Sequence, residues 1–424
     1  MIRSLGMMSS DAKRILVIGG GISGITAAVE AAEVGYEVIL VEKEPCLGGR
    51  VIRMHQYFPK MCPPACGLEI NLRRIRQNPR ITVYTLAEVE HVSGSRGNFE
   101  VSIHQRPRYV TGNVPIPDTL VDSLESLRPD EFNYGMGKTK ALYLPHEMAY
   151  PMMHVLDRRA LSVHDKEHIQ RTCPQGTIDL DMQSKSIQVN VGSMIVATGW
   201  QPYDAAKIAP LGFGRCTNVI TNVMMERLAA NNGPTGGTVL RPSDSIEPKT
   251  VAFVQCAGSR DENHLPYCSS VCCMGTLKQT RYIRERCPEA AISIFYIDIR
   301  TTGRHEKYYY DLLGDDHVRF VKGKVARVDE EPATRNLKVD VEDSMSGKKY
   351  QGCFDLVILA TGIVPCAGIA KLPIPGLQYD GYGFLVNDEG ERGIFAAGCA
   401  RRPSDVSQSV KDGTAAALKA IQCL

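Results

Sequence analysis

A glycine-rich turn near the N-terminus constrains the fold of this chain more than any other sequence feature. Gly19-Gly20-Gly21-Ile22-Ser23-Gly24 follows an apolar run at residues 14–18 and precedes an alanine-rich stretch at residues 25–35 that is typical of a helix. A second apolar run, residues 36–42, ends in the acidic Glu42. This order of strand, G-x-G-x-x-G turn, helix, strand and acidic residue is typical of a dinucleotide-binding unit.

Each part of this unit has its own physical task. Gly19 permits the tight turn, Gly21 lets the backbone approach a pyrophosphate, and Gly24 lets the helix pack closely on the strand. The helix N-terminus offers free N–H groups and the positive end of its dipole to phosphates. The carboxylate of Glu42 is placed to hold ribose hydroxyls. We therefore predict a bound dinucleotide here, against the alternative of a glycine-rich turn without a ligand.

Downstream segments favour FAD over NAD as this dinucleotide. The loop Cys46-Leu47-Gly48-Gly49-Arg50, two strand-then-Ala-Thr-Gly elements at residues 194–202 and 356–365, and the segment 393–400 before a helical stretch resemble glutathione-reductase-like flavoproteins. The residues predicted to contact FAD are Gly19, Gly21, Ile22, Ser23, Gly24, Glu42, Lys43, Gly48, Gly49, Arg50, Val89, Ala197, Thr198, Gly199, Ala360, Thr361, Gly362, Gly398 and Cys399.

A second nucleotide-fold half follows in the middle of the chain, but its turn lacks the expected glycines. Residues 249–255 and 292–298 read as its first two strands. The turn after the first of them is Cys256-Ala257-Gly258-Ser259-Arg260 instead of G-x-G-x-x-G. Because this turn does not supply the glycines that cradle phosphates, we predict that this half holds no nicotinamide nucleotide.

Cysteines occupy the same region. Cys256, Cys268, Cys272 and Cys273 form the pattern C-x11-C-x3-C-C, within a chain of 14 cysteines. Four thiolates from one short region suit a [4Fe-4S] cluster. The adjacent pair at the end is unusual for zinc, whose ligand pairs are normally spaced. We predict a [4Fe-4S] cluster, with a zinc site and buried unreactive thiols as the alternatives.

A second cysteine pair, Cys62 and Cys66, is spaced C-x3-C about a dozen residues after the Gly-Gly-Arg loop. Three interpretations stay open for it: a redox dithiol, thiols that line the flavin site or a partner interface, and ligands to a metal shared with another subunit. The basic residues around the pair are a solvated helix face, a docking face, or positive charge near the flavin that stabilises its anionic reduced form.

Three segments resemble the family of heterodisulfide reductase A subunits: residues 254–279, residues 130–145 and residues 393–410. Gly398-Cys399 is what that family shows where other flavoproteins have Gly-Asp. Within the family, residues 57–81 are similar to the A subunits of quinone-interacting membrane-bound oxidoreductases. The likeness extends over almost the whole chain, and its cysteine segment is the most specific part.

The resemblance implies an oxidoreductase subunit that transfers electrons between FAD and one [4Fe-4S] cluster. It implies partner redox subunits, including a membrane quinone-binding subunit, and electron exchange between the quinone pool and adenylylsulfate reductase in dissimilatory sulfur metabolism. The alternatives are the A subunit of a soluble heterodisulfide-reductase-like sulfur-oxidising complex, a stand-alone NAD(P)H-dependent disulfide reductase using Cys62 and Cys66, and an assembly subunit with a redox-silent flavin.

Composition and charge limit the partners and the location. The formal net charge of +2 gives no reason to expect nucleic acid as a partner. Residues 1–14 lack the apolar core of a signal peptide. The sequence contains no run of about 18 apolar residues, so no direct membrane span is expected. We expect a cytoplasmic protein, held at the inner face of the cytoplasmic membrane through partner subunits.

The fold class predicted from these features is α/β, with the two dinucleotide-binding domains of the thioredoxin-reductase/glutathione-reductase-like flavoproteins. The expected FAD-binding domain is discontinuous, and a cluster-holding domain of the NAD(P)-binding type interrupts it. The predicted boundaries are 1–105 for the first part of the FAD domain, 106–185 for a degenerate ferredoxin-like insert, 186–245 for the second part and a linker, 246–350 for the cluster-holding domain, and 351–424 for the C-terminal part. Residues 233–249 read as the linker between the domains.

Overall fold

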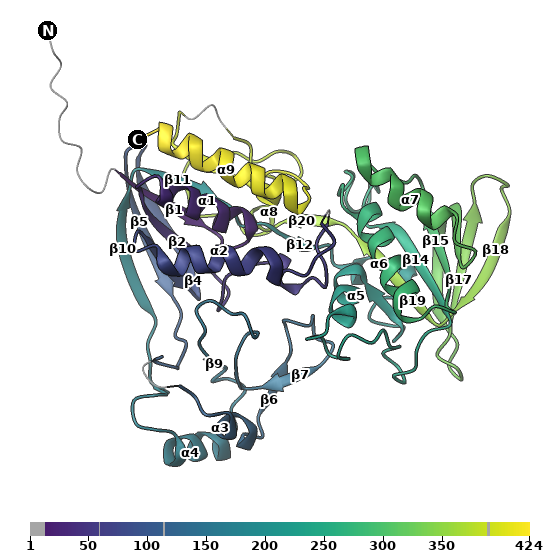
Figure 1. The fold of residues 1–424 in the computed structure, drawn as a ribbon, viewed down its shortest axis with the longest axis horizontal. Coiled ribbons are helices and arrows are strands. Elements are labelled where there is room, and N and C mark those ends of the chain that lie inside the picture. The colour runs from purple at the N-terminus through teal and green to yellow at the C-terminus, as the bar shows by residue number, and fades with distance from the viewer. Residues whose placement is uncertain (1–12, 59, 113–114, 388–390) are drawn as a thin grey trace, which may run out of the picture.

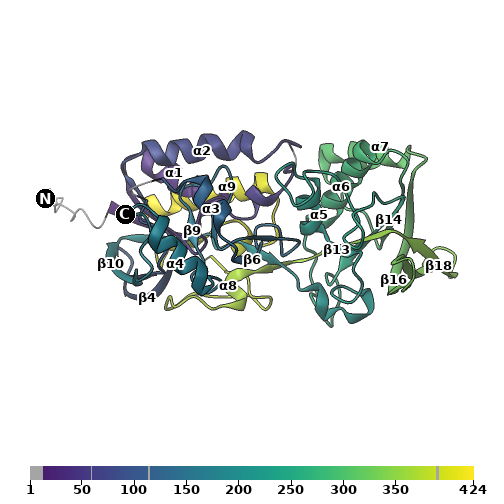
Figure 2. The same cartoon turned by 90° about the horizontal axis from the view of Figure 1, so that it is seen from below.

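The computed structural model describes residues 13–58, 60–112, 115–387 and 391–424. The expectation about a signal peptide falls mainly on residues 1–12, outside this described part. The chain forms two α/β units beside one another, with a smaller third unit attached to the first of them (Figure 1). The view from below shows the same two units end to end (Figure 2).

The first domain is built on a parallel five-stranded sheet with the order β21-β11-β1-β2-β3. Apolar residues fill its strands because both faces of the sheet are covered. Alternate residues of β1 point to opposite faces, so that Ile15 and Val17 belong to one apolar core and Leu16 and Ile18 to another. The strands are β1 (Arg14–Ile18), β2 (Glu37–Glu42), β3 (Ile81–Thr85), β11 (Ser193–Val196) and β21 (Ile394–Ala396).

Helices cover one face of this sheet and an antiparallel sheet covers the other (Figure 2). The helices are α1 (Ile22–Glu33), α2 (Ala65–Gln77) and α9 (Val406–Gln422). The antiparallel sheet, with the order β10-β5-β4, consists of β4 (Ala87–Ser95), β5 (Asn98–Gln105) and β10 (Lys185–Val191). Because α1 starts directly after β1, its N-terminus lies at the carboxyl edge of the parallel sheet.

The insert between β5 and β10 has a small core of its own, which includes Val110, Leu120, Leu142 and Ile169. It lies below the first domain in Figure 1. Its elements are α3 (Asp118–Ser123), β6 (Leu127–Pro129), β7 (Lys138–Lys140), β8 (Leu142–Tyr143), β9 (Val155–Leu156) and α4 (Val163–Thr172).

The second domain contains a seven-stranded sheet with the order β13-β19-β14-β15-β16-β17-β18. The first five strands are parallel and the last three form an antiparallel meander. Its strands are β13 (Val219–Thr221), β14 (Thr250–Ala257), β15 (Ala291–Tyr296), β16 (Val318–Glu330), β17 (Leu337–Asp343), β18 (Lys349–Phe354) and β19 (Leu356–Thr361), and its helices are α5 (Asn222–Ala229), α6 (Cys272–Arg286) and α7 (Glu306–Leu313).

Two strands of this sheet come from outside residues 246–350, the range expected for the second domain. β13 precedes that range and β19 follows it, and each pairs with neighbours in the sheet. The chain crosses between the domains twice, through the antiparallel pair β12 (Trp200–Pro202) and β20 (Ile363–Pro365). α8 (Cys366–Ile369) and five short 3₁₀ helices (Val51–Arg53, Ala205–Lys207, Ala209–Leu211, Gly303–His305 and Gly398–Ala400) complete the described elements.

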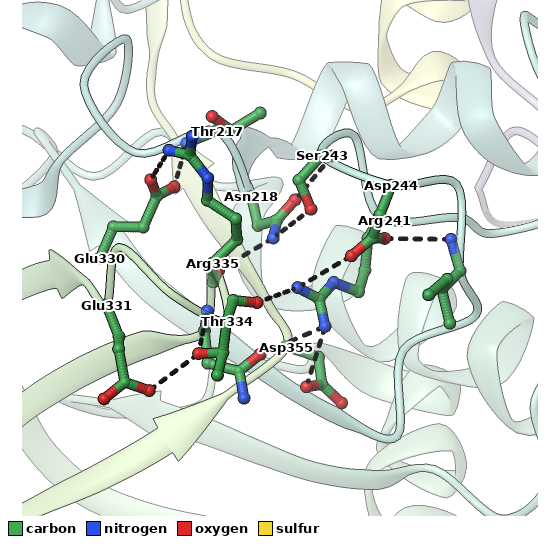
Figure 3. A network of polar contacts seen from close by, with 12 residues as sticks. Thr217, Asn218, Arg241, Ser243, Asp244, Glu330, Glu331, Thr334, Arg335 and Asp355 are labelled. Carbon is green, nitrogen blue, oxygen red and sulfur yellow. Dashed lines mark hydrogen bonds and ion pairs between the residues drawn. The ribbon is translucent and has the colours of Figure 1, made fainter.

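The segment 233–249, expected as a linker between domains, follows β13 and α5 and lies on the second domain. Arg241 fixes it there: its Nη2 atom donates to the carbonyl oxygen of Thr334 at 2.9 Å, and its Nη1 atom lies 3.4 Å from Asp355 Oδ1. The Nη2 atom of Arg241 also forms an ion pair with Asp244 Oδ2 at 3.2 Å. Figure 3 shows this network of polar contacts between the segment and the ends of the strands.

In the described residues, the structure contains no helix that combines the length and the apolar character needed to cross a membrane.

Candidate functional site

A cavity of about 600 Å³ lies where the two domains and the insert meet. From the first domain it is lined by the start of α1, the loop 42–54, residues 197–200 and the start of α9. The second domain contributes Cys268, the first turns of α6 and residues around Arg300, and the insert contributes Arg128 and Tyr143. The carboxyl ends of β1, β2 and β11 open on this cavity, which is where dinucleotides bind in such sheets.

Two glycines form the narrowest part of the cradle. A Cβ atom on Gly49, whose φ is +57°, would lie 2.8 Å from the Cα atom of Gly21. The loop 48–50 and the start of α1 therefore approach each other backbone to backbone. At the other end of the turn, a Cβ atom on Gly24 would lie 1.9 Å from the carbonyl oxygen of Gly19, so that only glycine allows α1 to pack this closely on β1.

Glu42 ends β2 at the wall of this cavity. The backbone N–H of Gly20 donates to its Oε2 atom at 2.6 Å, and that of Glu44 donates to its Oε1 atom at 2.8 Å. Burial raises the pKa of Glu42, against the lowering effect of these two hydrogen bonds. Each carboxylate oxygen has a further lone pair, so the oriented carboxylate can still accept hydrogen bonds from ribose hydroxyls.

The cavity offers hydrogen-bond donors that no described protein group uses. α1 starts at Ile22 without a side-chain cap, so its first N–H groups point to the cavity side. The Oγ1 atom of Thr198 is buried, has no hydrogen-bond partner among the described residues and belongs to a residue that lines the cavity. Together with the two-glycine cradle and Glu42, these donors fit an extended dinucleotide such as FAD.

Positive side chains stand on the same wall. Arg50 donates from Nε to the carbonyl oxygen of Trp200 at 3.1 Å, and its guanidinium lies over the rings of Trp200 and Tyr134 at 5.9 and 5.8 Å. Lys43 lines the cavity next to Glu42. These cations complement a ligand that carries phosphates.

The structure brings most of the residues predicted to contact FAD to this cavity. Gly19, Gly21, Ile22, Ser23, Glu42, Lys43, Gly49, Arg50, Ala197, Thr198, Gly199 and Cys399 line it. Gly24 lies in the first turn of α1, Gly48 lies in the loop after β2, and Gly398 begins the 3₁₀ helix Gly398–Ala400. Val89 lies in the apolar core beneath the sheet.

The second Ala-Thr-Gly element lies elsewhere. Ala360 and Thr361 end β19 in the second domain, and Gly362 follows, so all three lie beside the cysteine segment. The Sγ atom of Cys272 donates to the carbonyl oxygen of Thr361 at 3.6 Å. A Cβ atom on Gly362 would lie 2.3 Å from Ser259 Oγ. This element therefore supports the cysteine segment of the second domain.

The four predicted cluster cysteines gather at the end of β14 and the start of α6. Cys272 and Cys273 are the first two residues of α6 and are buried, whereas Cys268 lines the cavity. Cys256 takes a φ of +57°, an unusual backbone conformation for a non-glycine residue, which marks a site under local constraint. The neighbouring thiols raise the pKa of Cys272, in addition to the larger effect of burial, so the four sulfur atoms share one neighbourhood.

These four residues fit a cluster by donor type and by neighbourhood. In the described part of the chain, no three His, Cys, Asp or Glu side chains stand close enough together to hold a metal ion as they are. The thiol of Cys273 donates to the carbonyl oxygen of Asp298 at 3.8 Å, and burial raises the pKa of Cys256 to about 11. Cluster binding therefore requires these thiols to lose their protons and turn toward the iron.

Residues 258–271 connect β14 to α6, where the second domain would have its nucleotide-binding turn. A Cβ atom on Gly258 would lie 2.6 Å from the ring of Tyr203. Ser259 Oγ and Ser269 Oγ lie 2.8 Å apart, and Tyr267 donates to the carbonyl oxygen of Ile363 at 2.8 Å. These contacts fix the connection between β14 and α6 in one conformation.

Several charged or polar residues of the site were not predicted from the sequence. Glu226 on α5 and Lys278 on α6 line the cavity and form a buried ion pair. Arg402 and Gln408 line it near the start of α9. The sequence signal that could have found the ion pair is Lys278 itself, a lysine within the otherwise largely buried helix α6.

The pair Cys62 and Cys66 lies at the start of α2, and neither residue belongs to the described lining of the cavity. Cys66 is exposed and Cys62 is partly buried.

The comparisons with known proteins agree with this geometry. Residues 14–59 match the family model for FAD dependent oxidoreductases. An iron-sulfur A subunit of CoB–CoM heterodisulfide reductase from Methanopyrus kandleri is 38% identical to this chain over 97% of the chain. The chain is a homologue of the A subunit of heterodisulfide reductase. The A subunit of a ferredoxin/F420H2-dependent CoB-CoM heterodisulfide reductase from Methanosarcina acetivorans is 36% identical over 100% of the chain.

This homologue spans less than two thirds of the length of these relatives, 64% of the first and 55% of the second. Solved structures show the same fold. Thioredoxin reductase from T. acidophilum aligns with a TM-score of 0.54 at 13% identity, over 97% of this chain and 98% of its own. Bacillithiol disulfide reductase from Bacillus cereus aligns with a TM-score of 0.52 at 13% identity, over 97% and 99%. The predicted fold class is confirmed.

Proposed function

We propose that this chain holds FAD and a [4Fe-4S] cluster and serves as an electron-transfer subunit of a larger redox complex. One observation carries the proposal: a single cavity is lined both by the dinucleotide cradle at Gly21 and Gly49 and by Cys268 of the cysteine segment. A ligand in the cradle would therefore lie in the same cavity as one of the four cysteines proposed to hold the cluster. Electrons could therefore pass between FAD and the cluster within this cavity.

The chain's own residues divide into two sets. The start of α1, Glu42 and Arg50 would hold the dinucleotide, and Cys256, Cys268, Cys272 and Cys273 would supply four thiolates. When bound, FAD exchanges two electrons, together or one by one, and an iron–sulfur cluster carries one at a time. Arg260 and Arg300 lie close enough to Cys256 and Cys268 to hydrogen-bond them, and such contacts favour the thiolates and tune the potential of the cluster.

The proposed partners are other redox subunits, because the relatives are named as subunits of heterodisulfide reductases. We propose electron exchange between the quinone pool and adenylylsulfate reductase in dissimilatory sulfur metabolism, through a membrane quinone-binding subunit that keeps this chain at the inner face of the cytoplasmic membrane. The resemblance of residues 57–81 to the A subunits of quinone-interacting oxidoreductases supports this choice.

Cofactor counting tests the core of the proposal. The chain, purified without oxygen, is expected to carry one FAD and about four iron atoms. Cys272→Ser should lose iron and keep its flavin. Cys353→Ser, at an exposed position on β18, is the matched control and should keep both. Equal iron content in the two variants would contradict the cluster assignment.

A second experiment tests the partners and the nicotinamide alternative. The tagged chain should co-purify with redox subunits identified by mass, and its flavin should be reduced by a quinol when those subunits are present. NADH and NADPH should leave the flavin oxidised, since the turn after β14 lacks the glycines that cradle phosphates. Rapid bleaching by NADPH would favour a stand-alone disulfide reductase instead.

A further inference from the structure

A group of three polar residues lies at the start of α9. The Nη2 atom of Arg402 lies 3.2 Å from Asp412 Oδ1, and the Nε2 atom of Gln408 donates to the same oxygen at 3.0 Å. Gln408 and Asp412 lie one helical turn apart on α9, and Arg402 precedes the helix. One carboxylate oxygen therefore holds two side chains that come from different parts of the backbone.

Asp412 is buried, with 8% exposure, whereas the side chain of Arg402 is 48% exposed. The second carboxylate oxygen, Oδ2, is buried and has no hydrogen-bond partner in the described residues. A buried carboxylate with one free oxygen is costly unless its charge has a counterpart. Arg402 supplies that counterpart, so the carboxylate restricts where the guanidinium can lie.

Arg402 and Gln408 both line the large cavity, and Asp412 lies behind them. The starts of α1 and α9 meet at this end, where the hydroxyl of Ser23 donates to the carbonyl oxygen of Ser409 at 2.9 Å. Two positive helix ends and one guanidinium therefore face the same part of the cavity. Two carboxylates are set against them: Asp405, which caps α9 and lines the cavity, and the buried Asp412.

We propose that Asp412 is a positioning residue that holds Arg402 and Gln408 at the cavity wall and sets the reduction potential of the flavin bound there. The inference rests on the proposed binding of FAD. Reduction adds negative charge to the flavin, and a nearby positive charge stabilises the reduced form. Arg402 raises the potential, and Asp412 limits that rise while it fixes the guanidinium in place.

The test is a charge cycle on the FAD-loaded chain. Arg402→Met removes the positive charge and is expected to lower the flavin midpoint potential. Asp412→Asn removes the negative charge and is expected to raise it. The double variant, with Arg402→Met and Asp412→Asn together, should lie between the two single variants. Shifts of opposite sign are a result that mere damage to the fold does not produce.

A binding measurement accompanies the potentials. Arg402→Met is expected to weaken FAD binding to the apoprotein by about tenfold, equivalent to about 1.4 kcal/mol. Lys411→Met, which removes a positive charge from the exposed side of α9, is the control and should change neither quantity. If Asp412→Asn does not fold, Gln408→Met and Arg402→Met still test whether these two side chains at the cavity wall act on the flavin. An unchanged flavin midpoint potential and an unchanged FAD affinity in both variants would overturn the proposal.

The remaining outcomes separate this inference from the proposed function. A wild-type chain that binds no FAD contradicts the proposed function itself. A chain that binds FAD but shows equal potentials in wild type, Arg402→Met and Asp412→Asn contradicts the role of Asp412 alone. Shifts of the same sign in the two single variants also contradict it.

Discussion

The Nζ atom of Lys278 on α6 lies 2.9 Å from the Oε1 atom of Glu226 on α5, and both side chains are more than nine-tenths buried. Lys278 also donates to the carbonyl oxygen of Gln56 in the first domain at 2.6 Å, and Glu226 accepts from the N–H of His55 at 3.1 Å. The pair therefore ties the two domains together at the wall of the cavity.

The first prediction concerns this pair. Lys278→Met should lower the free energy of unfolding by about 3 kcal/mol, because it leaves the carboxylate of Glu226 buried without its cation. Lys307→Met, which breaks an exposed pair with Asp311 on α7, is the control and should cost less than about 0.5 kcal/mol. Urea unfolding of both variants measures the difference, and similar losses would show that the buried pair has no special weight.

The second prediction concerns the cradle. Gly49→Ala places a methyl group 2.8 Å from the Cα atom of Gly21, so the loop and α1 must move apart. We expect FAD affinity to fall by more than about tenfold, equivalent to about 1.4 kcal/mol. Gly236→Ala is the matched control: its φ is +62° and its added methyl group meets no atom within 4 Å. Fluorescence titration of the apoproteins with FAD should show a loss for Gly49→Ala and none for the control.

The third prediction concerns pH. Burial, with a smaller contribution from Arg227 and Arg53, lowers the pKa of His146 to about 4. The unfolded chain thus binds a proton at this histidine between about pH 6.5 and pH 4, while the folded chain does not. The histidine's contribution to stability is complete above about pH 6.5 and is lost progressively as the pH falls toward 4, by up to about 3 kcal/mol.

His146→Gln removes this titration. Its stability should therefore fall less than that of wild type between pH 7.5 and pH 5, as measured by urea unfolding. His91→Gln, an exposed substitution on β4, is the control and should follow wild type. If the free energy of unfolding changes with pH in the same way in wild type and in His146→Gln, folding does not keep His146 neutral.

The fourth prediction concerns the network in Figure 3. Arg241→Ala leaves the carboxylate of Asp355 without its cation and the carbonyl oxygen of Thr334 without its hydrogen-bond donor. We therefore expect the free energy of unfolding to fall by about 2 to 3 kcal/mol. Arg327→Ala, which removes an exposed pair with Asp329, should cost less than about 1 kcal/mol. Proteolysis of the segment 233–249 should become faster only in Arg241→Ala.

The local patterns led directly to the fold class. The spacing of glycines after Ile18 and the acidic end of the next strand predicted the strand–turn–helix unit, and the structure has it as β1, α1 and β2. The glycines also located most of the cavity wall, because a backbone that must approach a ligand closely leaves its mark as glycine in the sequence. The assignments of individual residues to FAD and iron stay predictions.

The domain limits, and the contacts between segments far apart in the sequence, could not be predicted from the sequence. β13 and β19 join the second sheet from outside its expected range, and nothing in their short apolar runs states which sheet they pair with. The segment 233–249 has the composition of a linker, yet Arg241 attaches it to the second domain.

The sequence by itself determined that this chain contains a dinucleotide-binding unit and a cysteine-rich segment where a second nucleotide turn would be. Both follow from local requirements, namely backbone space at glycines and clustered thiols. Only the tertiary structure decided that the cradle and Cys268 share one cavity, that Lys278 and Glu226 form an ion pair at its wall, and that Asp412 contacts Arg402 there. Most of these groups are far apart along the chain, and the packing of the two domains, of α1 and of α9 brings them together.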